Sequence, residues 1–337
     1  MYEEVPRGFF MLVILTVLLN FIAGSFLIVF GVKALGKTLE RAGSTLLAKV
    51  MRAFTRNRWT AFLAGTFTTA MVQSSTAVTL LTIGFVDSGL MTLESACAVI
   101  FGANIGTTIT AQLMSFSLTE YAYYILIAGS VFALGLVPKL ETAGRALMSV
   151  GLMFSGLYIL GQSIRLIQDS PAVSAWLTEH ASSVPLCLLF GIVVTMLVQS
   201  SSATVGMTIL LFGSGLMPFA SAVALTLGDN IGTCMTAQIA SIRLGLPGRR
   251  TAWAHTLYNI IGAAVAMALL PQFCALVEWF TRAVGQDEGR LVANTHTLFN
   301  VLSAAVFLPI TRLYARFIEW IVPGRQPAAA RVRRALE

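Results

Sequence analysis

The stretch MVQSSTAVTLL, residues 71–81, places a glutamine and two serines inside a long apolar segment. A second stretch, LVQSSSATVGM at residues 197–207, does the same 126 positions later. Polar groups are costly in the hydrocarbon region of a membrane, so a polar turn that occurs twice indicates a functional role. We therefore expect both turns to serve the same purpose in the folded protein.

The composition identifies the environment of the chain. Of its 337 residues, 56% are hydrophobic and only 11% are charged, and the mean hydropathy is +0.80. A soluble domain carries about a quarter charged residues. Apolar runs at residues 9–32, 121–138 and 251–271 approach or exceed the ~20 residues that cross a bilayer as a helix. These features predict an all-α polytopic membrane protein.

The polar turns belong to an internal repeat. Residues 65–112 align without a gap on residues 191–238, with 24 identities at 48 positions. The identities include both QSS turns and most of the segments GANIG at 102–106 and GDNIG at 228–232. Two unrelated apolar helices would not match at so many polar positions, so the chain contains two copies of one structural unit.

Each copy is expected to contain a span, a re-entrant hairpin around its QSS turn, a broken transmembrane helix and a closing span. The hairpins are expected at 60–86 and 184–212, and the broken helices at 91–114 and 217–242, interrupted at GANIG and GDNIG. Three crossings in each copy make the second copy inverted relative to the first. The expected division is a first inverted repeat at 9–140, a second at 144–271, an additional transmembrane helix at 291–310 and a basic cytoplasmic tail at 311–337.

The charges of the connecting segments support the inversion. Residues 33–58 carry seven cationic side chains and one acidic one, whereas residues 165–183 carry one cationic and two acidic ones. The positive-inside rule therefore places the first segment in the cytoplasm and the second outside. This predicts a bacterial inner-membrane protein with seven crossings, its N-terminus outside and its C-terminus cytoplasmic. The net charge of +7 then reflects topology, and no nucleic-acid partner is expected.

A helix that begins inside the membrane offers unpaired N–H groups and the positive end of its dipole, and both favour an anion. Small hydroxyl residues cap such a helix start and donate hydrogen bonds to the oxygens of an anion. The anion-binding residues expected on this basis, which suit phosphate-like oxygens, are Gln73, Ser74, Ser75, Thr76, Gln199, Ser200, Ser201 and Ser202.

Neutral side-chain oxygens near the same turns suit a small hard cation. The sodium-binding residues expected are Gln73, Asn104, Thr107, Thr110, Gln112, Gln199, Asn230, Thr233, Thr236 and Gln238. Four glycines are expected to permit the helix breaks: Gly102, Gly106, Gly228 and Gly232. For any single Ser or Thr the simpler interpretation is a hydrogen bond between helices, but the doubled pattern favours a site.

Asp229 stands where the first copy has Ala103. A carboxylate in a membrane segment is costly and by default functional, so Asp229 is assigned to cation or proton coupling, with a structural cap as the alternative. The segments AHTLYN at 254–259 and THTLFN at 295–300 resemble each other, and His255 and His296 are expected to bond neighbouring helices rather than sense pH.

The segments VQSSTAVT and VQSSSATV, each followed by GANIGTTIT or GDNIGTCMT, resemble the paired QSSS-containing hairpins of the type II sodium/phosphate cotransporter family. The resemblance implies Na⁺-coupled transport of inorganic phosphate, held between the two turns, with Na⁺ as the coupling ion and no cofactor. Many bacterial members continue into a PhoU-like domain, so the resemblance implies that this regulation is either absent here or supplied by a separate PhoU-like regulator. Membrane lipid and a second copy in a homodimer are the other partners expected.

The sequence departs from the family pattern at two places, and one of them is Asp229, where the first copy has Ala103. Members often carry a His and an Asn on the helix after each broken span; His255 and Asn259 fit after the second copy, whereas residues 120–130 lack both. This leaves the Na⁺ stoichiometry open.

Other function classes are less well supported. No HExxH, GxSxG or clustered His/Asp/Glu set indicates an enzyme. A channel also uses half-helices, and saturable, Na⁺-dependent uptake would distinguish a transporter from it. A phosphate exporter and a Na⁺- or H⁺-coupled transporter of another small anion are the remaining alternatives, because the gradients set the direction.

Overall fold

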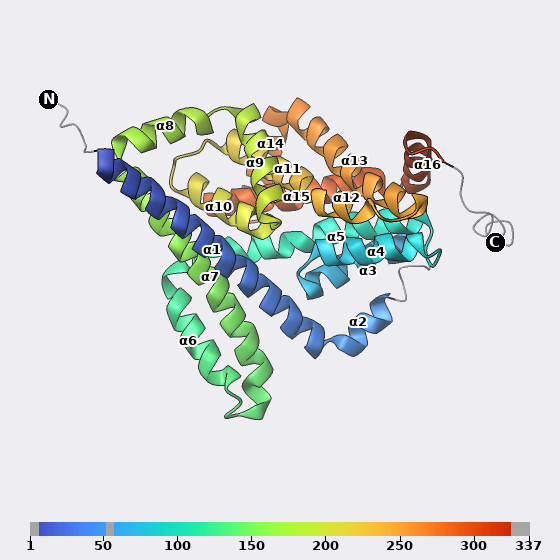
Figure 1. Ribbon diagram of the computed structural model, residues 1–337, viewed down its shortest axis with the longest axis horizontal. Coiled ribbons are helices and arrows are strands. Elements are labelled where there is room, and N and C mark those ends of the chain that lie inside the picture. Colours follow the sequence, from blue (N-terminus) through green and yellow to red (C-terminus); the bar gives the residue numbers. More distant parts are fainter. Residues whose placement is uncertain (1–6, 52–56, 325–337) are drawn as a thin grey trace. The chain divides into compact units, whose positions relative to one another are not determined.

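The computed structural model describes residues 7–51 and 57–324, and all the regular secondary structure in this part of the chain is helical (Figure 1). The α-helices are α1 (Arg7–Ala42), α2 (Ser44–Met51), α3 (Arg58–Val72), α4 (Ser75–Asp87), α5 (Leu93–Met114), α6 (Ala122–Ala133), α7 (Glu141–Gln168), α8 (Pro171–Ala181), α9 (Val184–Val198), α10 (Ser201–Gly213), α11 (Phe219–Gly232), α12 (Met235–Ser241), α13 (Leu246–Ala268), α14 (Leu270–Ala283), α15 (Leu291–Phe307) and α16 (Thr311–Ile321).

The described residues form two compact units that do not follow the halves of the sequence. The first unit contains residues 7–38, 110–229 and 270–295, and the second contains the remainder. The chain passes from one unit to the other within α1, α5, α11 and α15, and between α13 and α14. The QSS turn at 73–76 therefore lies in the second unit, and the turn at 199–202 lies in the first.

In the first unit, α6 and α7 form an antiparallel pair (Figure 1), and α1 packs across α7 through glycines. A Cβ atom on Gly24 of α1 would lie 2.8 Å from the carbonyl oxygen of Gly156 in α7. A Cβ atom on Gly129 of α6 would lie 2.2 Å from the backbone nitrogen of Met148 in α7. Small residues permit such close approach between helices in a membrane, where dispersion contacts drive their association.

In the second unit, α13 packs against α4, α12 and α16, and its core is aromatic. The rings of Phe101 in α5 and Tyr258 in α13 are stacked with centroids 4.4 Å apart. The Tyr314 hydroxyl of α16 donates to the carbonyl oxygen of Ala254 at 2.6 Å, so this buried phenol is satisfied. These contacts join the helix after the second QSS region to the helix that carries GANIG.

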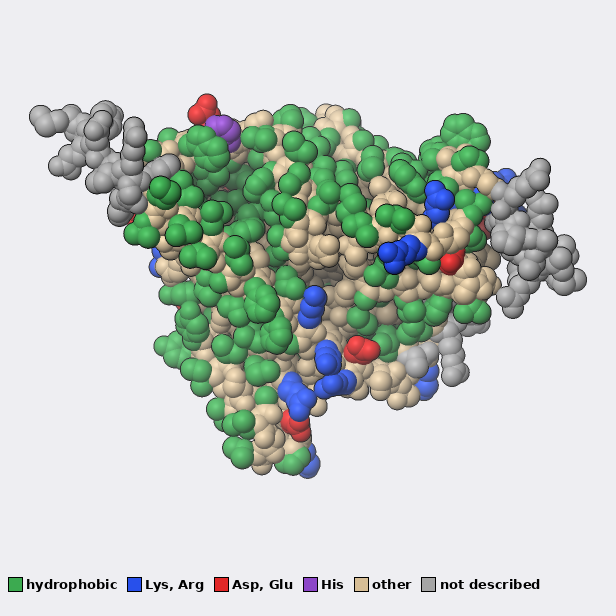
Figure 2. All heavy atoms as spheres, in the orientation of Figure 1, with side chains coloured by type: hydrophobic (Ala, Val, Ile, Leu, Met, Phe, Trp, Pro, Cys, Tyr) green, Lys and Arg blue, Asp and Glu red, His purple; other side chains and the backbone are tan. Residues whose placement is uncertain are grey.

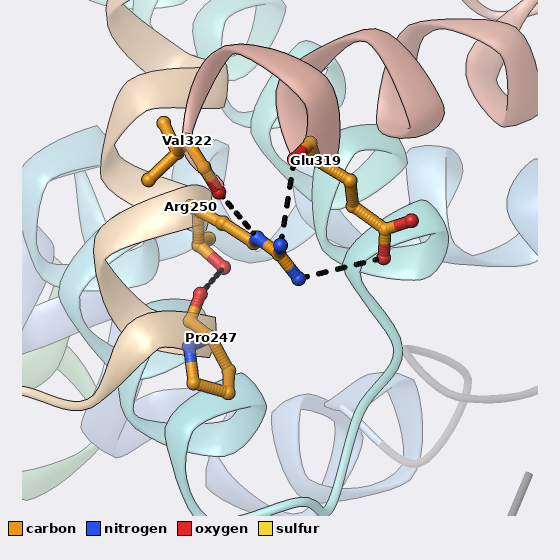
Figure 3. A network of polar contacts seen from close by, with 5 residues as sticks. Pro247, Arg250, Glu319 and Val322 are labelled. Carbon is orange, nitrogen blue, oxygen red and sulfur yellow. Dashed lines mark hydrogen bonds and ion pairs between the residues drawn. The ribbon is translucent and has the colours of Figure 1, made fainter. Parts of the chain in front are cut away.

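A buried arginine fixes the end of α16 on α13 (Figure 3). Arg250 donates through Nε to the carbonyl oxygen of Val322 at 3.0 Å and through Nη2 to that of Glu319 at 3.4 Å. Its Nη1 lies 3.9 Å from Oε1 of Glu319. A cation at a helix C-terminus satisfies the last carbonyl groups and complements the helix dipole, so Arg250 acts as the C-terminal cap of α16.

Replacement of Arg250 by Gln should destabilise the protein, because the last carbonyl groups of α16 lose a charged donor. We expect a loss of about 1.5–3 kcal/mol, measured as a lower thermal unfolding temperature of the detergent-solubilised protein. Arg249→Gln is the matched control, since Arg249 is exposed on the same helix turn. An equal loss in both variants would mean that the cap contributes nothing specific.

The helices support a multi-pass membrane protein. By length and composition three described helical segments are long and apolar enough to span a membrane: Met11–Ala42, Leu93–Met114 and Pro138–Gln168. The number rises to six if each pair of helices bent by 88–98° counts as one span. Figure 2 shows hydrophobic side chains over the outward faces of α1 and α6, as expected for lipid contact. The seven crossings and their orientation stay predictions.

The structure corrects one expected boundary and shows helices in three other expected segments. The expected closing span at 121–138 is helical as α6 over only 12 residues, or roughly 18 Å at 1.5 Å per residue. It ends because Gly135 adopts a left-handed conformation (φ 77°) and Pro138 follows. The connectors 33–58 and 165–183 are largely helical, in α1, α2, α7 and α8. The expected tail at 311–337 begins with α16, and its residues 325–337 lie outside the described part.

Candidate functional site

Each QSS turn has the same backbone conformation. Gln73 ends α3 in the left-handed region (φ 55°, ψ 30°), and Ser74 is extended and caps α4 by accepting from the backbone N–H of Ala77 at 3.2 Å. Gln199 ends α9 with φ 53° and ψ 33°, and Ser200 caps α10 by accepting from Ala203 at 3.4 Å. Gln73 and Gln199 are the only non-glycine residues with positive φ in the described part of the chain.

This geometry starts a helix directly after the two polar residues. Ser75 and Ser201 are the first residues of α4 and α10, where the backbone N–H groups have no partner within the helix. Ser74 and Ser200 accept a backbone hydrogen bond through Oγ, and each hydroxyl hydrogen is still able to donate. Both turns thus present a set of donors that suits an anion with several oxygens.

The hairpin helices pack on the helices that carry GANIG and GDNIG, and this packing repeats at the offset of 126. A Cβ atom on Gly65 would lie 2.3 Å from the Val99 oxygen, and one on Gly191 would lie 2.2 Å from the Leu225 oxygen. Glycines on the partner helices also approach closely. A Cβ atom on Gly102 would lie 2.0 Å from the oxygen of Phe62, and one on Gly228 would lie 2.1 Å from that of Leu188.

The expected break at GANIG is wrong for the first copy, because α5 is continuous from Leu93 to Met114. Gly102 and Gly106 do not break α5; they bring its backbone against α3, where any larger residue would clash. In the second copy the helix is interrupted directly after GDNIG: α11 ends at Gly232 and α12 begins at Met235. The two copies therefore differ at the position where the sequence predicted a shared break.

The residues expected to bind sodium fall into both units. Asn104, Thr107, Asn230, Thr233, Thr236 and Gln238 lie in the second unit, and Thr110 and Gln112 lie in the first. Within the second unit, Asn104 donates to Oδ1 of Asn259 at 3.0 Å, and Gln238 donates to the Thr256 hydroxyl at 2.6 Å. Asn259 was singled out from the sequence only through the family resemblance, and Asn300, which donates to Asn230, was not assigned a role.

The guanidinium group of Arg290 lies beside Gln112. Its Nε2 donates to Oδ1 of Asn294 at 3.0 Å, and Nη1 of Arg290 lies 3.4 Å from its Oε1. The same Nη1 donates to the Gln112 carbonyl oxygen at 3.0 Å and to the Ser115 hydroxyl at 2.8 Å. A guanidinium group at this distance repels a bound Na⁺. In this arrangement Gln112 fastens the end of α5 in the first unit, and Arg290 is a residue that sequence reasoning missed.

Asp229 is fully buried and is part of a chain of hydroxyl groups within the first unit. Thr195 of α9 donates to Oδ1 of Asp229 at 2.9 Å, and Thr204 of α10 lies 2.8 Å from the Thr195 hydroxyl. The equivalent residues of the first copy are Thr69, Val78 and Ala103, which contain no carboxylate. A carboxylate oxygen and two hydroxyl oxygens in one buried cluster form a hard donor set of the kind that suits an alkali cation, and only the second copy has it.

Comparison with known proteins identifies one family. The family model described as "Na+/Pi-cotransporter" matches residues 27–162 and 166–282. "Uncharacterized protein YqeW" of Bacillus subtilis is 28% identical over 265 residues, which are 78% of this chain and 85% of that protein. No solved structure matches the chain.

Two further relatives have names that refer to phosphate. "Putative inorganic phosphate export protein YjbB" of Salmonella typhimurium is 27% identical over 77% of this chain, and the match covers 48% of that relative, about half its length. "Sodium-dependent phosphate transport protein 2A" of Ovis aries is 32% identical over 40% of this chain and 23% of that protein.

Proposed function

Because the chain belongs to the Na⁺/Pi-cotransporter family, we propose that it moves inorganic phosphate across the plasma membrane by Na⁺-coupled symport with alternating access. The observation that carries the proposal is the QSS turn, which occurs twice with the same left-handed glutamine and extended serine. The family consists of transporters and not of enzymes, and the apolar helices agree with a multi-pass membrane protein.

The phosphate is proposed to be bound by the two turns, through the hydroxyl groups and the free N–H groups at the starts of α4 and α10. Charge-assisted hydrogen bonds of this kind are about twice as strong as neutral ones. The equal conformation of the turns supports equal roles for Ser75 and Ser201. The inverted orientation of the two copies, which the loop charges predict, belongs to the same proposal.

Na⁺ is proposed to bind through neutral oxygens of the segments that follow the hairpins and, in the second copy, through Asp229. Asn104 and Asn230 are the best-supported neutral ligands, because each is buried and bonded to another asparagine of the second unit. Gln112 is left out of the proposed set because of Arg290. The single carboxylate in the second copy supports unequal cation sites in the two copies.

Phosphate export is the second candidate, and it is favoured by the names of relatives whose match covers 77% of this chain. Export and import require the same phosphate and cation sites. They differ in the gradients that drive the cycle and in the affinities on the two sides of the membrane.

Uptake of ³²P-phosphate by purified protein in liposomes tests the proposal. An inward Na⁺ gradient should raise the initial rate well above the rate in K⁺ or choline, and the rate should saturate with phosphate. Flux that is indifferent to Na⁺ would exclude Na⁺ coupling, and flux that does not saturate would favour a channel. Loading the liposomes with phosphate and placing Na⁺ inside tests export with the same protein.

A further inference from the structure

A second internal repeat covers the end of the chain. Residues 249–280 align without a gap on residues 290–321, an offset of 41, with 11 identities at 32 positions. The aligned segments include HTLYN and HTLFN, a shared Ala-Ala-Val and a shared Glu-Trp. The identical residues of the first copy are Arg249, Ala252, His255, Thr256, Leu257, Asn259, Ala263, Ala264, Val265, Glu278 and Trp279.

The helices follow this repeat. Each copy is a long helix that contains HTLYN or HTLFN, a break, and a shorter helix that contains the Glu-Trp pair: α13 with α14, and α15 with α16. In both cases the break between the long and the short helix is at most four residues long. By position in the larger repeat, α13 corresponds to α6, because each closes its copy. By the sequence likeness at the offset of 41, α13 corresponds to α15.

The asparagines of the two HTL segments each contact an asparagine of the larger repeat. Asn104 donates to Asn259 at 3.0 Å, and Asn300 donates to Asn230 at 3.3 Å. Asn104 and Asn230 are equivalent at the offset of 126, and Asn259 and Asn300 are equivalent at the offset of 41. All four lie in the second unit, so an asparagine of one repeat meets an asparagine of the other twice. The direction of the hydrogen bond differs, since Asn104 is the donor in the first contact and Asn230 is the acceptor in the second.

The two contacts share their burial and one further hydrogen bond. All four asparagines are at most 7% exposed. Asn259 donates to the carbonyl oxygen of His255 at 3.1 Å, and Asn300 donates to that of His296 at 2.8 Å, four residues earlier in each helix. Each of these bonds orients the side-chain amide that contacts the asparagine of the larger repeat. Asn259 is held through both its amide oxygen and its amide nitrogen, whereas Asn300 is held through its nitrogen alone, because its buried Oδ1 has no partner among the described residues. A side chain fixed in this way orients the residue that it contacts.

We infer that α13–α14 and α15–α16 are matched arms of the two large repeats, and that Asn259 and Asn300 position Asn104 and Asn230 for cation-coupled transport. The inference rests on the proposed function for the consequence in transport, but the pairing of the arms does not depend on it. The His and Asn absent after the first copy are thus supplied, as His296 and Asn300, by a helix near the end of the described chain.

Transport assays with alanine variants test the positioning role. Asn259→Ala and Asn300→Ala should each raise the Na⁺ concentration for half-maximal phosphate uptake by about tenfold, with a smaller change in the maximal rate. The two effects should agree within about threefold. Thr251→Val and Thr295→Val are matched controls on α13 and α15, since each buried hydroxyl bonds a carbonyl of its own helix. If Thr251→Val and Thr295→Val raise this Na⁺ concentration as much as the asparagine variants do, the positioning role is wrong.

Double variants separate positioning from general packing. Asn259→Ala should add nothing to Asn104→Ala, because it acts through that residue, and Asn300→Ala should add nothing to Asn230→Ala. The same cycles are measured by thermal unfolding in detergent without Na⁺, where each pair should show coupling. Additive effects in both assays overturn the inference. If the wild-type protein shows no Na⁺-dependent flux, the proposed function fails, and the unfolding cycles still decide the pairing of the arms.

Discussion

Loss of one hydroxyl from either QSS turn should weaken the apparent affinity for phosphate about 10- to 150-fold. The estimate follows from about 1.5–3 kcal/mol for a hydrogen bond to a charged group and about 1.4 kcal/mol per decade of affinity. Ser75→Ala and Ser201→Ala should be similar, because both residues begin a helix after the same turn. The measurement is the phosphate dependence of uptake in proteoliposomes.

Ser88→Ala is the control for these variants. Ser88 is exposed after α4, and its hydroxyl bonds the carbonyl oxygen of Phe85 at 3.2 Å. Its removal should leave uptake close to that of the wild type. Near-normal uptake by both Ser75→Ala and Ser201→Ala, in protein that is folded and inserted, would place the phosphate elsewhere.

Removal of the buried Asp229 carboxylate should weaken the apparent affinity for Na⁺ by a comparable factor. Asp229→Ala combined with Thr204→Val gives the second copy the residues of the first, Ala103 and Val78, so the variant residues already occur in an equivalent hairpin. We expect the Na⁺ concentration for half-maximal uptake to rise at least tenfold, by the loss of an interaction worth about 1.4 kcal/mol or more. The phosphate affinity at saturating Na⁺ should change much less.

The Na⁺ activation curve and the pH dependence of uptake are measured together for this variant. An unchanged Na⁺ curve would show that Asp229 has a structural role only. A lost dependence on the pH gradient, with the Na⁺ curve intact, would assign the carboxylate to proton coupling. Thr204→Val alone serves as the control that keeps the charge.

Much of the helical layout could be predicted from the sequence. The paired helices α3–α4 and α9–α10 begin and end within about two residues of the expected hairpins at 60–86 and 184–212. The reason is local, because a short polar turn interrupts a run of apolar residues that is otherwise continuous. Whether these pairs enter and leave on the same side of the membrane stays a prediction.

The role of the glycines could not be predicted from the sequence. Gly102 and Gly228 stand at equivalent positions, and a glycine in a helical segment fits both a break and a close contact. The oxygens of Phe62 and Leu188, which are 40 residues earlier in the chain, decide for a close contact. The asparagine pairs also could not be predicted, because they depend on which distant segments meet. Asn104 and Asn259, for example, are separated by 155 residues.

The two left-handed glutamines imply a trade between stability and activity. A left-handed conformation costs an ordinary L-residue roughly 1–2 kcal/mol, and glycine avoids most of that cost. At both turns the chain nevertheless carries a side chain that its backbone disfavours. A protein built only to be stable would have glycine at residues 73 and 199. We therefore predict that the strain is retained for the glutamine side chains, and that glycine at either position raises the stability of the protein and lowers its rate of transport.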